Sequence, residues 1–291
     1  MQNLPLGMRT DSVLTTGMIL GQQRYAYPSQ RLAFFEEVEA RLRRLPGVVA
    51  LAISDSLPPG GPTQAMIYSR LDIAGRPPLS EGTGGMVVWR SVTPEYFSAL
   101  NIPIRSGHGF QEKDRELSEN SVILSASLAR RLFPDQDPLL ARLRPGGVGP
   151  WLTVLGVASD VANAGLTTQN DPEYYVVRKH GIRLDPDAPV PPEGQRSANL
   201  ILRTSIDPRT TATWVRSEIA AIDPTLPISM ESMHQRVNKL MRRPRFNAFL
   251  LTSFAGMAFA GRDRALRGDV IPGCPENSGN RRPNGFGRNA P

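Results

Sequence analysis

Hydrophobic and polar positions change period twice near the start of the chain. Residues 11–21 are rich in β-prone apolar side chains and predict a strand. From Leu32 to Leu45 apolar residues recur at spacings of three and four, behind Ser29 as a candidate N-cap, which predicts a helix. The Pro46-Gly47 pair ends this helix, and residues 48–54 have the pattern of a short buried strand. The pattern therefore predicts a β-α-β unit.

A second unit of the same kind is predicted near the other end. Residues 199–205 have a strand pattern, and Asp207-Pro208 supplies a cap and a proline for the first turn of a helix that runs to Ile222. Residues 226–230 then predict a short strand, followed by another helix. Two similar units at the two ends predict one lobe built from both, with an insertion between them.

The middle of the chain has a different pattern. Residues 66–75 and 85–92 alternate like strands, and residues 93–100 open with Thr-Pro and predict a short helix. A strand followed by a helix is predicted over residues 121–134. Further strands are expected at 152–161 and 173–177, and a proline-rich exposed loop at 181–196. The middle is expected to form a second small α/β lobe.

An uncharged apolar run, residues 246–260, resembles the start of a membrane span. A span needs about 20 apolar residues, and this run stops after fifteen. The residues before it include Arg242, Arg243 and Arg245, and the residues after it are rich in arginine, glycine and proline. The pattern predicts a membrane helix that begins at 242–260 and is interrupted.

Charge is concentrated in the same tail. The chain of 291 residues has a net charge of +7, and residues 242–291 hold nine arginines against three acidic residues, so residues 1–241 are nearly neutral. No basic strand with interleaved aromatic residues accompanies the tail, which disfavours nucleic-acid binding. The single cysteine, Cys274, excludes an intrachain disulfide. Residues 1–13 lack the pattern of a secretory signal peptide.

Motifs for catalysis are missing from the chain. It contains no phosphate-binding G-x-x-x-x-G-K-[ST] sequence, no G-x-S-x-G elbow and no H-E-x-x-H sequence. His108, His180 and His234 lie far apart and are expected to be surface or locally bonded side chains rather than zinc ligands. Asp160 and Glu173 are candidates for a carboxylate pair, although acids at strand ends usually face solvent or cap turns.

Two further features favour a structural interpretation. The phrase SGHGF, residues 106–110, lacks the following helix or lysine of a phosphate site and is better explained as a tight turn. Met230, Met233 and Met241 have helical spacing and are expected to fill the core. We therefore predict no catalytic, cofactor-binding or metal site.

Several phrases occur together in the order and spacing of one protein family. They are RLAFFEEVEARLRRLPGVVALAIS, VTPEYFSALNIPIRSGHGF, SVILSASLARRLFPDQDP, LTVLGVASDV, ILRTSIDP, AIDPTLPIS and RPRFNAFLLTSFAGMAFA. Over about residues 10–260 the chain resembles the periplasmic core domain of MacB-type, FtsX-like ABC transporter permeases, with most likeness to the large, often duplicated permeases of acidobacterial type.

The resemblance implies an α+β, two-lobed extracytoplasmic domain. Its porter-like βαβ lobe is expected from residues 1–92 and 197–241, its inserted small α/β lobe from residues 93–196, and a truncated transmembrane helix from residues 242–260. In such permeases the ATPase is a separate cytoplasmic domain or subunit, which agrees with the missing phosphate loop. The resemblance therefore implies an inner-membrane permease with this domain facing the periplasm.

The tail from residue 261 departs from the family pattern. Codons compatible with residues 261–289, read one base later, can encode the glycine-rich apolar continuation that these permeases have. We therefore expect residues 261–291 to be an out-of-frame translation without stable structure, and the chain to be a permease fragment.

Two functions are compatible with the sequence. The first, implied by the resemblance, is a non-catalytic domain that relays conformational change from a cytoplasmic ABC ATPase to a substrate or partner outside the membrane, as in efflux. Expected partners are that ATPase, a second permease copy, and lipid near Arg242, Arg243 and Arg245, with no nucleic acid. The second is a soluble small-molecule binding module or hydrolase with an interlobe cleft.

Overall fold

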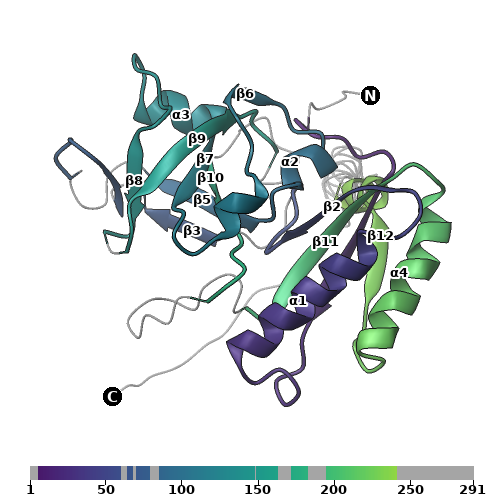
Figure 1. Cartoon of the computed structure of the whole chain (residues 1–291). Helices are drawn as coiled ribbons and strands as arrows, with labels where there is room; N and C mark the ends of the chain where they lie inside the picture. Colours follow the sequence, from purple (N-terminus) through teal and green to yellow (C-terminus); the bar gives the residue numbers. More distant parts are fainter. Residues whose placement is uncertain are drawn as a thin grey trace, which may run out of the picture. The chain divides into compact units, whose positions relative to one another are not determined.

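A computed structural model describes residues 6–59, 64–67, 70–78, 85–147, 149–162, 172–182 and 195–240. These residues form a mixed α/β fold around a twelve-stranded sheet (Figure 1). The strand order is β12-β1-β11-β2-β5-β10-β7-β9-β8-β4, with β3 added beside β5 and β6 beside β9. The described residues all belong to one compact unit, and residues 241–291 lie outside the described residues.

Four neighbouring strands at one end of this order come from the two ends of the described chain. We call them the terminal section; they are β1 (Val13–Ile19), β2 (Val48–Ser54), β11 (Ser197–Thr204) and β12 (Ser229–Ser232). Strand β11 lies antiparallel between β1 and β2, and β1 lies antiparallel between β11 and β12. Each pair of strands joined by a helix is therefore parallel, with one strand of the other pair between them.

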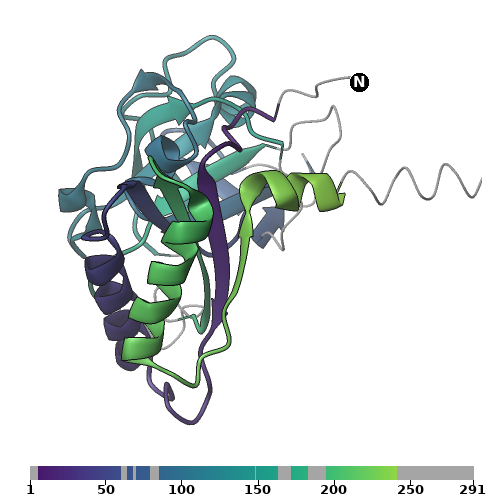
Figure 2. The ribbon, with the colours of Figure 1, turned by 90° about the vertical axis from the view of Figure 1, so that its right-hand side faces the viewer.

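Helices α1 (Pro28–Leu42) and α4 (Pro208–Ile222) cover one face of the terminal section (Figures 1 and 2). Each begins with a proline in its first turn, where the missing N–H costs no helical hydrogen bond. The apolar stripe of each helix packs on alternate residues of the strands. The core formed in this way includes Phe35, Val38, Leu42, Leu200 and Val215.

The remaining strands form what we call the central section. They are β3 (Gln64–Ile67), β4 (Leu71–Ile73), β5 (Met86–Val92), β6 (Ile104–Gly107), β7 (Ser121–Ser125), β8 (Arg142–Pro145), β9 (Leu152–Ala158) and β10 (Glu173–Val177). Helix α3 (Ala126–Leu132) packs on this section, and its N-cap Ser125 accepts a hydrogen bond from the amide of Leu128 at 3.3 Å. Strands β3, β4 and β5 precede residue 93 yet pair within this section.

Most elements expected from the sequence are present. The strand expected at 173–177 is β10. The helix expected over residues 32–45 is α1, and the helix expected to run from Pro208 to Ile222 is α4. The prediction of a single strand at 66–75 is wrong, because two short strands, β3 and β4, lie in this region. The strand expected at 226–230 begins later, at Ser229, where pairing with β1 starts. The lobe boundaries at residues 92 and 196 stay predictions.

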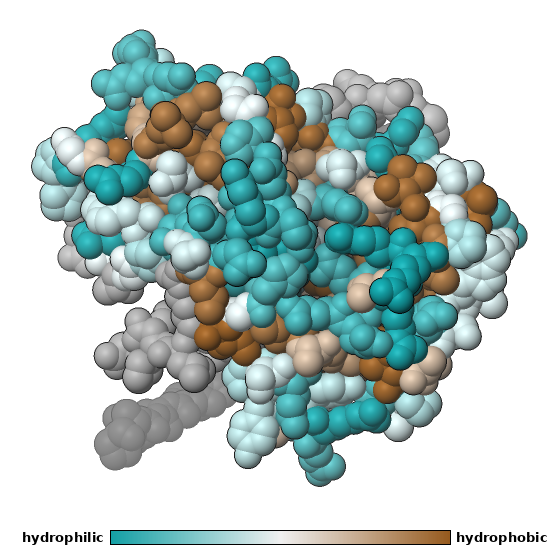
Figure 3. Space-filling model, viewed as in Figure 1, coloured by the Kyte–Doolittle hydropathy of each residue, from teal (hydrophilic) through white to brown (hydrophobic). Residues whose placement is uncertain are grey.

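No helix among the described residues is long and apolar enough to cross a membrane. The expected membrane helix at 242–260, the tail at 261–291 and Met241 all lie outside the described residues, as does most of the proline-rich loop. Hydrophilic residues cover most of the face seen in Figure 3, and hydrophobic residues form separate small groups on it.

Candidate functional site: a groove and two connections between the sheet sections

The two sheet sections meet at one edge of β2. Ser54 of β2 and Val92 of β5 are the one residue pair that joins the two strands. Next to it, the amide of Ile53 donates to the hydroxyl of Thr93 at 2.9 Å, and the amide of Thr93 donates to the carbonyl of Ile53 at the same distance. Thr93 thus extends the pairing by one residue and uses its side chain as the acceptor.

A buried ion pair lies beside this pairing. Arg90 on β5 and Glu173 on β10 have no solvent exposure, and their Nε and Oε1 atoms are 3.3 Å apart. Arg90 donates to the hydroxyl of Tyr96 at 2.6 Å, and the hydroxyl of Tyr175 donates to Glu173 at 2.7 Å. We call these four residues, with Thr93, the joint.

Electrostatics in the joint favour the charged arginine. Burial alone would lower the pKa of Arg90, but Glu173 and Tyr96 outweigh it and raise that pKa. Burial raises the pKa of Tyr96, as it does that of Tyr175. Both phenols therefore remain neutral donors and acceptors at physiological pH.

A short helix directly after the joint shapes a groove. Helix α2 (Tyr96–Ala99) follows Pro94, which fixes the start of the turn, and ends before Asn101. Asn101 has a φ of 52°, a left-handed conformation that asparagine tolerates better than most residues. The amide of Ile102 donates back to the carbonyl of Phe97 at 2.8 Å, so the chain reverses toward β6.

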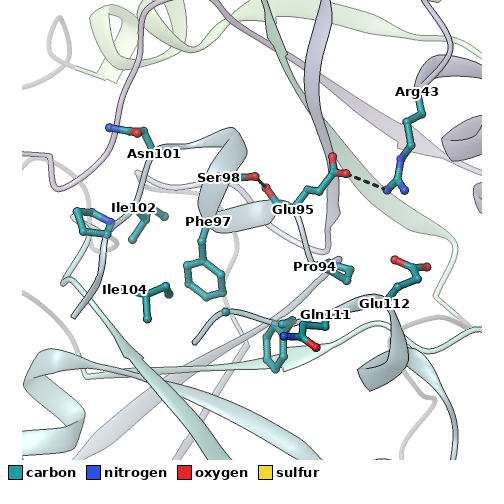
Figure 4. Close-up of a pocket in the computed structure, with 13 residues that line it drawn as sticks. Arg43, Pro94, Glu95, Phe97, Ser98, Asn101, Ile102, Ile104, Gln111 and Glu112 are labelled. Atoms are coloured by element: carbon teal, nitrogen blue, oxygen red, sulfur yellow. Dashed lines mark hydrogen bonds and ion pairs between the residues drawn. The ribbon is translucent and has the colours of Figure 1, made fainter. Parts of the chain in front are cut away.

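The groove has a volume of about 750 Å³ and is shown in Figure 4. Its floor is apolar and consists of Phe97, Ile102, Ile104 and Phe110. Its rim is charged and comes from both sections, with Arg43 at the end of α1 and Glu95 and Glu112 from the chain around α2 and β6. All lining residues except Arg43 lie between residues 94 and 112.

The carboxylates of the groove already have structural partners. Glu95 accepts the amide of Leu51 at 2.8 Å and lies 3.6 Å from Arg43. Burial would raise the pKa of Glu112, but Arg115 and His180 outweigh it, so that pKa is lowered. Ser98 donates to a backbone carbonyl, that of Glu95. Within the described part of this groove, the geometry suits an apolar or amphipathic group better than acid-base catalysis.

A second set of contacts joins the sections next to the groove. The 3₁₀ helix η2 (Glu112–Arg115) follows β6 and faces α1. The side chain of Arg115, 4 % exposed, contacts both carboxylate oxygens of Glu39 at 3.2 Å and that of Glu112 at 3.1 Å. His180, after β10, lies between Glu36 of α1 and Glu112. We call Glu36, Glu39, Glu112, Arg115 and His180 the clasp.

The histidines considered in the sequence do not come together. The Nδ1 atom of His108 lies 2.8 Å from the carbonyl of Gly109, and His234 contacts Asn238. His180 lies at the surface, as expected, but its partners are 144 and 68 residues away in the sequence. No group of three His, Cys, Asp or Glu residues in the described ranges could hold a metal ion.

Asp160 and Glu173, the candidate carboxylate pair, have different structural roles. Asp160 accepts the amide of Ser127 at 2.7 Å and contacts Arg130 at 3.4 Å. Glu173 is fully buried in the joint, so its expected exposure to solvent is wrong. The interpretation of Met233 as a core residue is confirmed, since it is fully buried.

The phrase SGHGF is partly strand rather than wholly a turn. Strand β6 includes Ser106 and Gly107, and the chain leaves the strand at Gly107, which has a φ of 69°. A Cβ atom there would lie 2.1 Å from the carbonyl of Leu155, so only glycine fits this close approach.

The sequence suggested an interlobe cleft as one alternative, but it did not indicate which residues line this groove. Its lining comes almost entirely from one continuous phrase, VTPEYFSALNIPIRSGHGF, followed by Gln111 and Glu112. The dense apolar positions of that phrase, next to Pro94 and Asn101, were the available signal. The clasp had no such signal, because its residues are spread over three distant segments.

Comparisons with known proteins agree with this fold. A family model described as a MacB-like periplasmic core domain matches residues 12–218. The crystal structure of the periplasmic region of MacB from Actinobacillus actinomycetemcomitans has a TM-score of 0.53 at 10% identity, covering 82% of this chain and 96% of that one. No curated protein gives a significant sequence match.

Two other solved structures have lower TM-scores. A domain of a permease protein from Porphyromonas gingivalis, itself named as putative, has a TM-score of 0.44 at 15% identity and covers 77% of this chain and 91% of that one. The extracellular domain of the ABC-type transporter YknZ from Gram-positive bacteria has a TM-score of 0.42 at 15% identity, with coverages of 72% and 91%.

Proposed function

The chain belongs to the family of MacB-like periplasmic core domains, and on that premise we propose that it is a non-catalytic relay. In this proposal, ATP hydrolysis by a cytoplasmic ABC ATPase moves membrane helices, and the domain transmits their motion to a substrate or partner outside the inner membrane. Its two parts are the porter-like lobe and the inserted lobe implied by the sequence. A relay needs stiff parts connected to two points that can move.

One observation supports the relay most directly. Strands β1 and β12 are hydrogen-bonded neighbours, with Leu14 opposite Ser232. The segment before β1 and the helical residues 233–240 after β12 therefore connect to the sheet at the same end of this strand pair (Figure 2). A displacement of either connection would pull on adjacent strands of one hydrogen-bonded sheet.

The partners follow from this arrangement. We propose that the ABC ATPase acts through membrane helices on both sides of the domain, that a second permease copy is present, and that Arg242, Arg243 and Arg245 contact lipid. These three arginines lie outside the described residues. The domain is proposed to face the periplasm, as its homologues do.

A distance measurement in membranes tests the relay. Tyr27 and Leu140 are 67% and 78% exposed and lie on the terminal and the central section, so both can be replaced by cysteine and spin-labelled after Cys274→Ser. In membranes that contain the chain together with an ABC ATPase, exchange of ADP for a non-hydrolysable ATP analogue should shift the label-to-label distance.

The location is tested with the same variants. A maleimide that does not cross membranes should label Tyr27→Cys from the periplasmic side only. A matched pair of labels within the terminal section, at Tyr27 and Trp214, should keep its distance in both nucleotide states. Labelling from the cytoplasmic side, or an unchanged distance in both pairs, would contradict the relay.

A second function is favoured by the groove. Its apolar floor and charged rim suit a small amphipathic ligand, as in a binding module or hydrolase with an interlobe cleft. Screening of the purified chain against amphipathic compounds and ester substrates, with Ile104→Asp as a groove-blocking variant, separates the two functions. Turnover that Ile104→Asp abolishes would favour the hydrolase over the relay.

A further inference from the structure

His180 lies between two carboxylates from different elements. Its Nδ1 atom is 2.8 Å from Oε1 of Glu36 on α1, and its Nε2 atom is 2.7 Å from Oε1 of Glu112 on η2. The side chains of His180 and Glu36 are 38% and 37% exposed, and that of Glu112 is 56% exposed. The imidazole therefore bridges the terminal and the central section at the surface.

The protonation state of the ring decides whether both contacts are hydrogen bonds. A neutral imidazole has one N–H donor and one acceptor nitrogen. A carboxylate only accepts, so a neutral ring can donate to Glu36 or to Glu112 but not to both. The protonated ring donates to both and adds an ionic attraction to each.

Several charged groups surround His180, and the partners of these groups decide whether the charge of the imidazole affects its contacts with Glu36 and Glu112. The charged groups from the elements packed against it are Glu36, Glu39 and Arg43 of α1, Glu112 and Arg115 of η2, and Arg178 and Lys179 of its own segment. Arg115 is bound to Glu39, to Oε1 of Glu112 and to the carbonyl of Arg178, and Lys179 donates to the carbonyls of Asp114, Glu116 and Glu119. Arg115 thus shares Glu112 with His180, and among these described groups it is the imidazole of His180 that joins Glu36 to Glu112.

From this geometry we infer that the clasp is a pH-dependent fastening between helix α1 and helix η2, complete when His180 is protonated and reduced to one hydrogen bond when it is neutral. Imidazole changes charge between about pH 5 and pH 8, whereas carboxylates of ordinary pKa stay ionised at pH 5.5. Acidification to pH 5.5 therefore closes the clasp. The joint contains no histidine.

This inference goes beyond the proposed function, because the clasp is a property of the folded domain alone. If the domain is a relay, the clasp makes the stiffness between its two sections depend on the proton concentration at the outer side of the membrane. That consequence rests on the proposed function, but the existence of the clasp does not.

A backbone hydrogen bond inside the clasp provides a local measurement. The amide of His180 donates to the carbonyl of Arg115 at 3.1 Å. In the full chain, the hydrogen-exchange protection factor of this amide should be about threefold higher at pH 5.5 than at pH 8. The increase is expected because the protonated ring forms ionic contacts with Glu36 and Glu112, each of the strength usual for exposed ion pairs. The protection factor is already corrected for the intrinsic pH dependence of exchange.

The variants separate the bridge from a general pH effect. His180→Gln should remove the dependence, so that the two protection factors agree within about 1.3-fold, since glutamine has no charge change in this range. Glu36→Gln and Glu112→Gln should each reduce the ratio. His108→Gln, at an exposed histidine whose ring contacts the carbonyl of Gly109, should retain the wild-type ratio.

Two outcomes would overturn the inference. One is a wild-type protection factor that is equal at the two pH values, and the other is a His180→Gln variant with the wild-type ratio. Neither outcome would affect the relay, which is tested by nucleotide-dependent distances. Conversely, an unchanged distance in membranes would leave the clasp in place.

Discussion

The joint and the clasp both lie where the two sheet sections meet, and they are built by opposite physical means. In the joint, a fully buried ion pair within the central section, Arg90 on β5 with Glu173 on β10, is held by two tyrosine hydroxyls and lies beside the pairing of Thr93 with β2, which joins the sections. The clasp is largely at the surface, where Glu36, Glu112 and His180 are each more than a third exposed. Its one deeply buried contact is that between Arg115 and Glu39.

This difference determines what each connection contributes. Buried charges lose their hydration, so they must keep their partners, and the loss of one partner is costly. Exposed charges interact weakly and are screened by salt, so their contacts form and break with little change in free energy. The buried ion pair therefore holds β5 and β10 rigidly beside the place where the sections meet, and the clasp adjusts how firmly the sections are held.

The largest expected effect is at Arg90. Arg90→Met leaves the carboxylate of Glu173 buried without its main cation, which should lower the free energy of unfolding by about 3–5 kcal/mol. Urea unfolding followed by tryptophan fluorescence or circular dichroism measures this loss.

Two controls sharpen this result. Arg90→Met combined with Glu173→Met removes both charges and should recover more than half of the loss. Arg130→Met removes an exposed cation from Asp160 and should leave the stability near that of the wild type. A loss at Arg90 no larger than that at Arg130 would show that the buried ion pair of the joint contributes no more than an exposed one.

The second largest effect is expected at the buried part of the clasp. Arg115→Met removes charge-assisted hydrogen bonds to Glu39 and to the carbonyl of Arg178, and should cost about 2–3 kcal/mol. The loss is smaller than at Arg90 because Glu39 keeps its contact with Arg43 at 2.8 Å. Arg43→Met, at a side chain that is 41% exposed, should cost clearly less in the same urea titration. Equal losses at the two arginines would contradict this ranking.

How far the sequence predicts a feature of the fold depends on the distance along the chain between the residues that form it. Helix α1 and strand β10 were predictable, because hydrophobic periodicity is local and extends over the whole element. Strands β6 and β8 were not predicted, because each has only four residues and several of these are polar. Their strand conformation comes from pairing with β9.

The sequence does not predict the joint or the clasp, because each depends on contacts between residues that are distant along the chain. Arg90 lies in an alternating strand, where a charged residue normally faces water, and its carboxylate partner Glu173 comes from a strand that is distant along the chain. His180 has the pattern of a loop histidine, because its partners Glu36 and Glu112 lie far from it in the sequence. The sequence did indicate the family, because whole phrases in order carry that information.

A third effect concerns the strand pairing of the joint. Thr93→Val keeps the shape of the side chain but removes the acceptor of the buried Ile53 amide, which should cost about 1–2 kcal/mol. Thr93→Ser keeps the hydroxyl and should retain most of that contribution, less the packing of one methyl group. Urea unfolding of both variants measures the difference. If Thr93→Ser were the less stable of the two, the methyl group and not the hydrogen bond would be the important part of Thr93.

The smallest effect belongs to the exposed part of the clasp and depends on pH. Burial would raise the pKa of Glu112, but Arg115 and His180 lower it below its ordinary value. A carboxylate with a lowered pKa in the folded state stabilises the fold above its unfolded pKa and loses that contribution as the pH falls through its folded pKa. Glu112 is more than half exposed, so solvent screening limits the difference between wild type and Glu112→Gln to about 0.5 kcal/mol at pH 6.

Acid and salt should both remove this difference, which makes it the sharpest contrast with the joint. At pH 3 the carboxyl of Glu112 approaches the neutral state that glutamine imitates, so the two proteins should unfold at closer urea concentrations than at pH 6. Addition of 1 M NaCl at pH 6 should have a similar effect, because it shortens the screening length to about 3 Å. The loss caused by Arg90→Met should persist in that salt, because its charges are out of contact with solvent. If salt reduced both losses in the same proportion, the buried and exposed connections would not differ in kind.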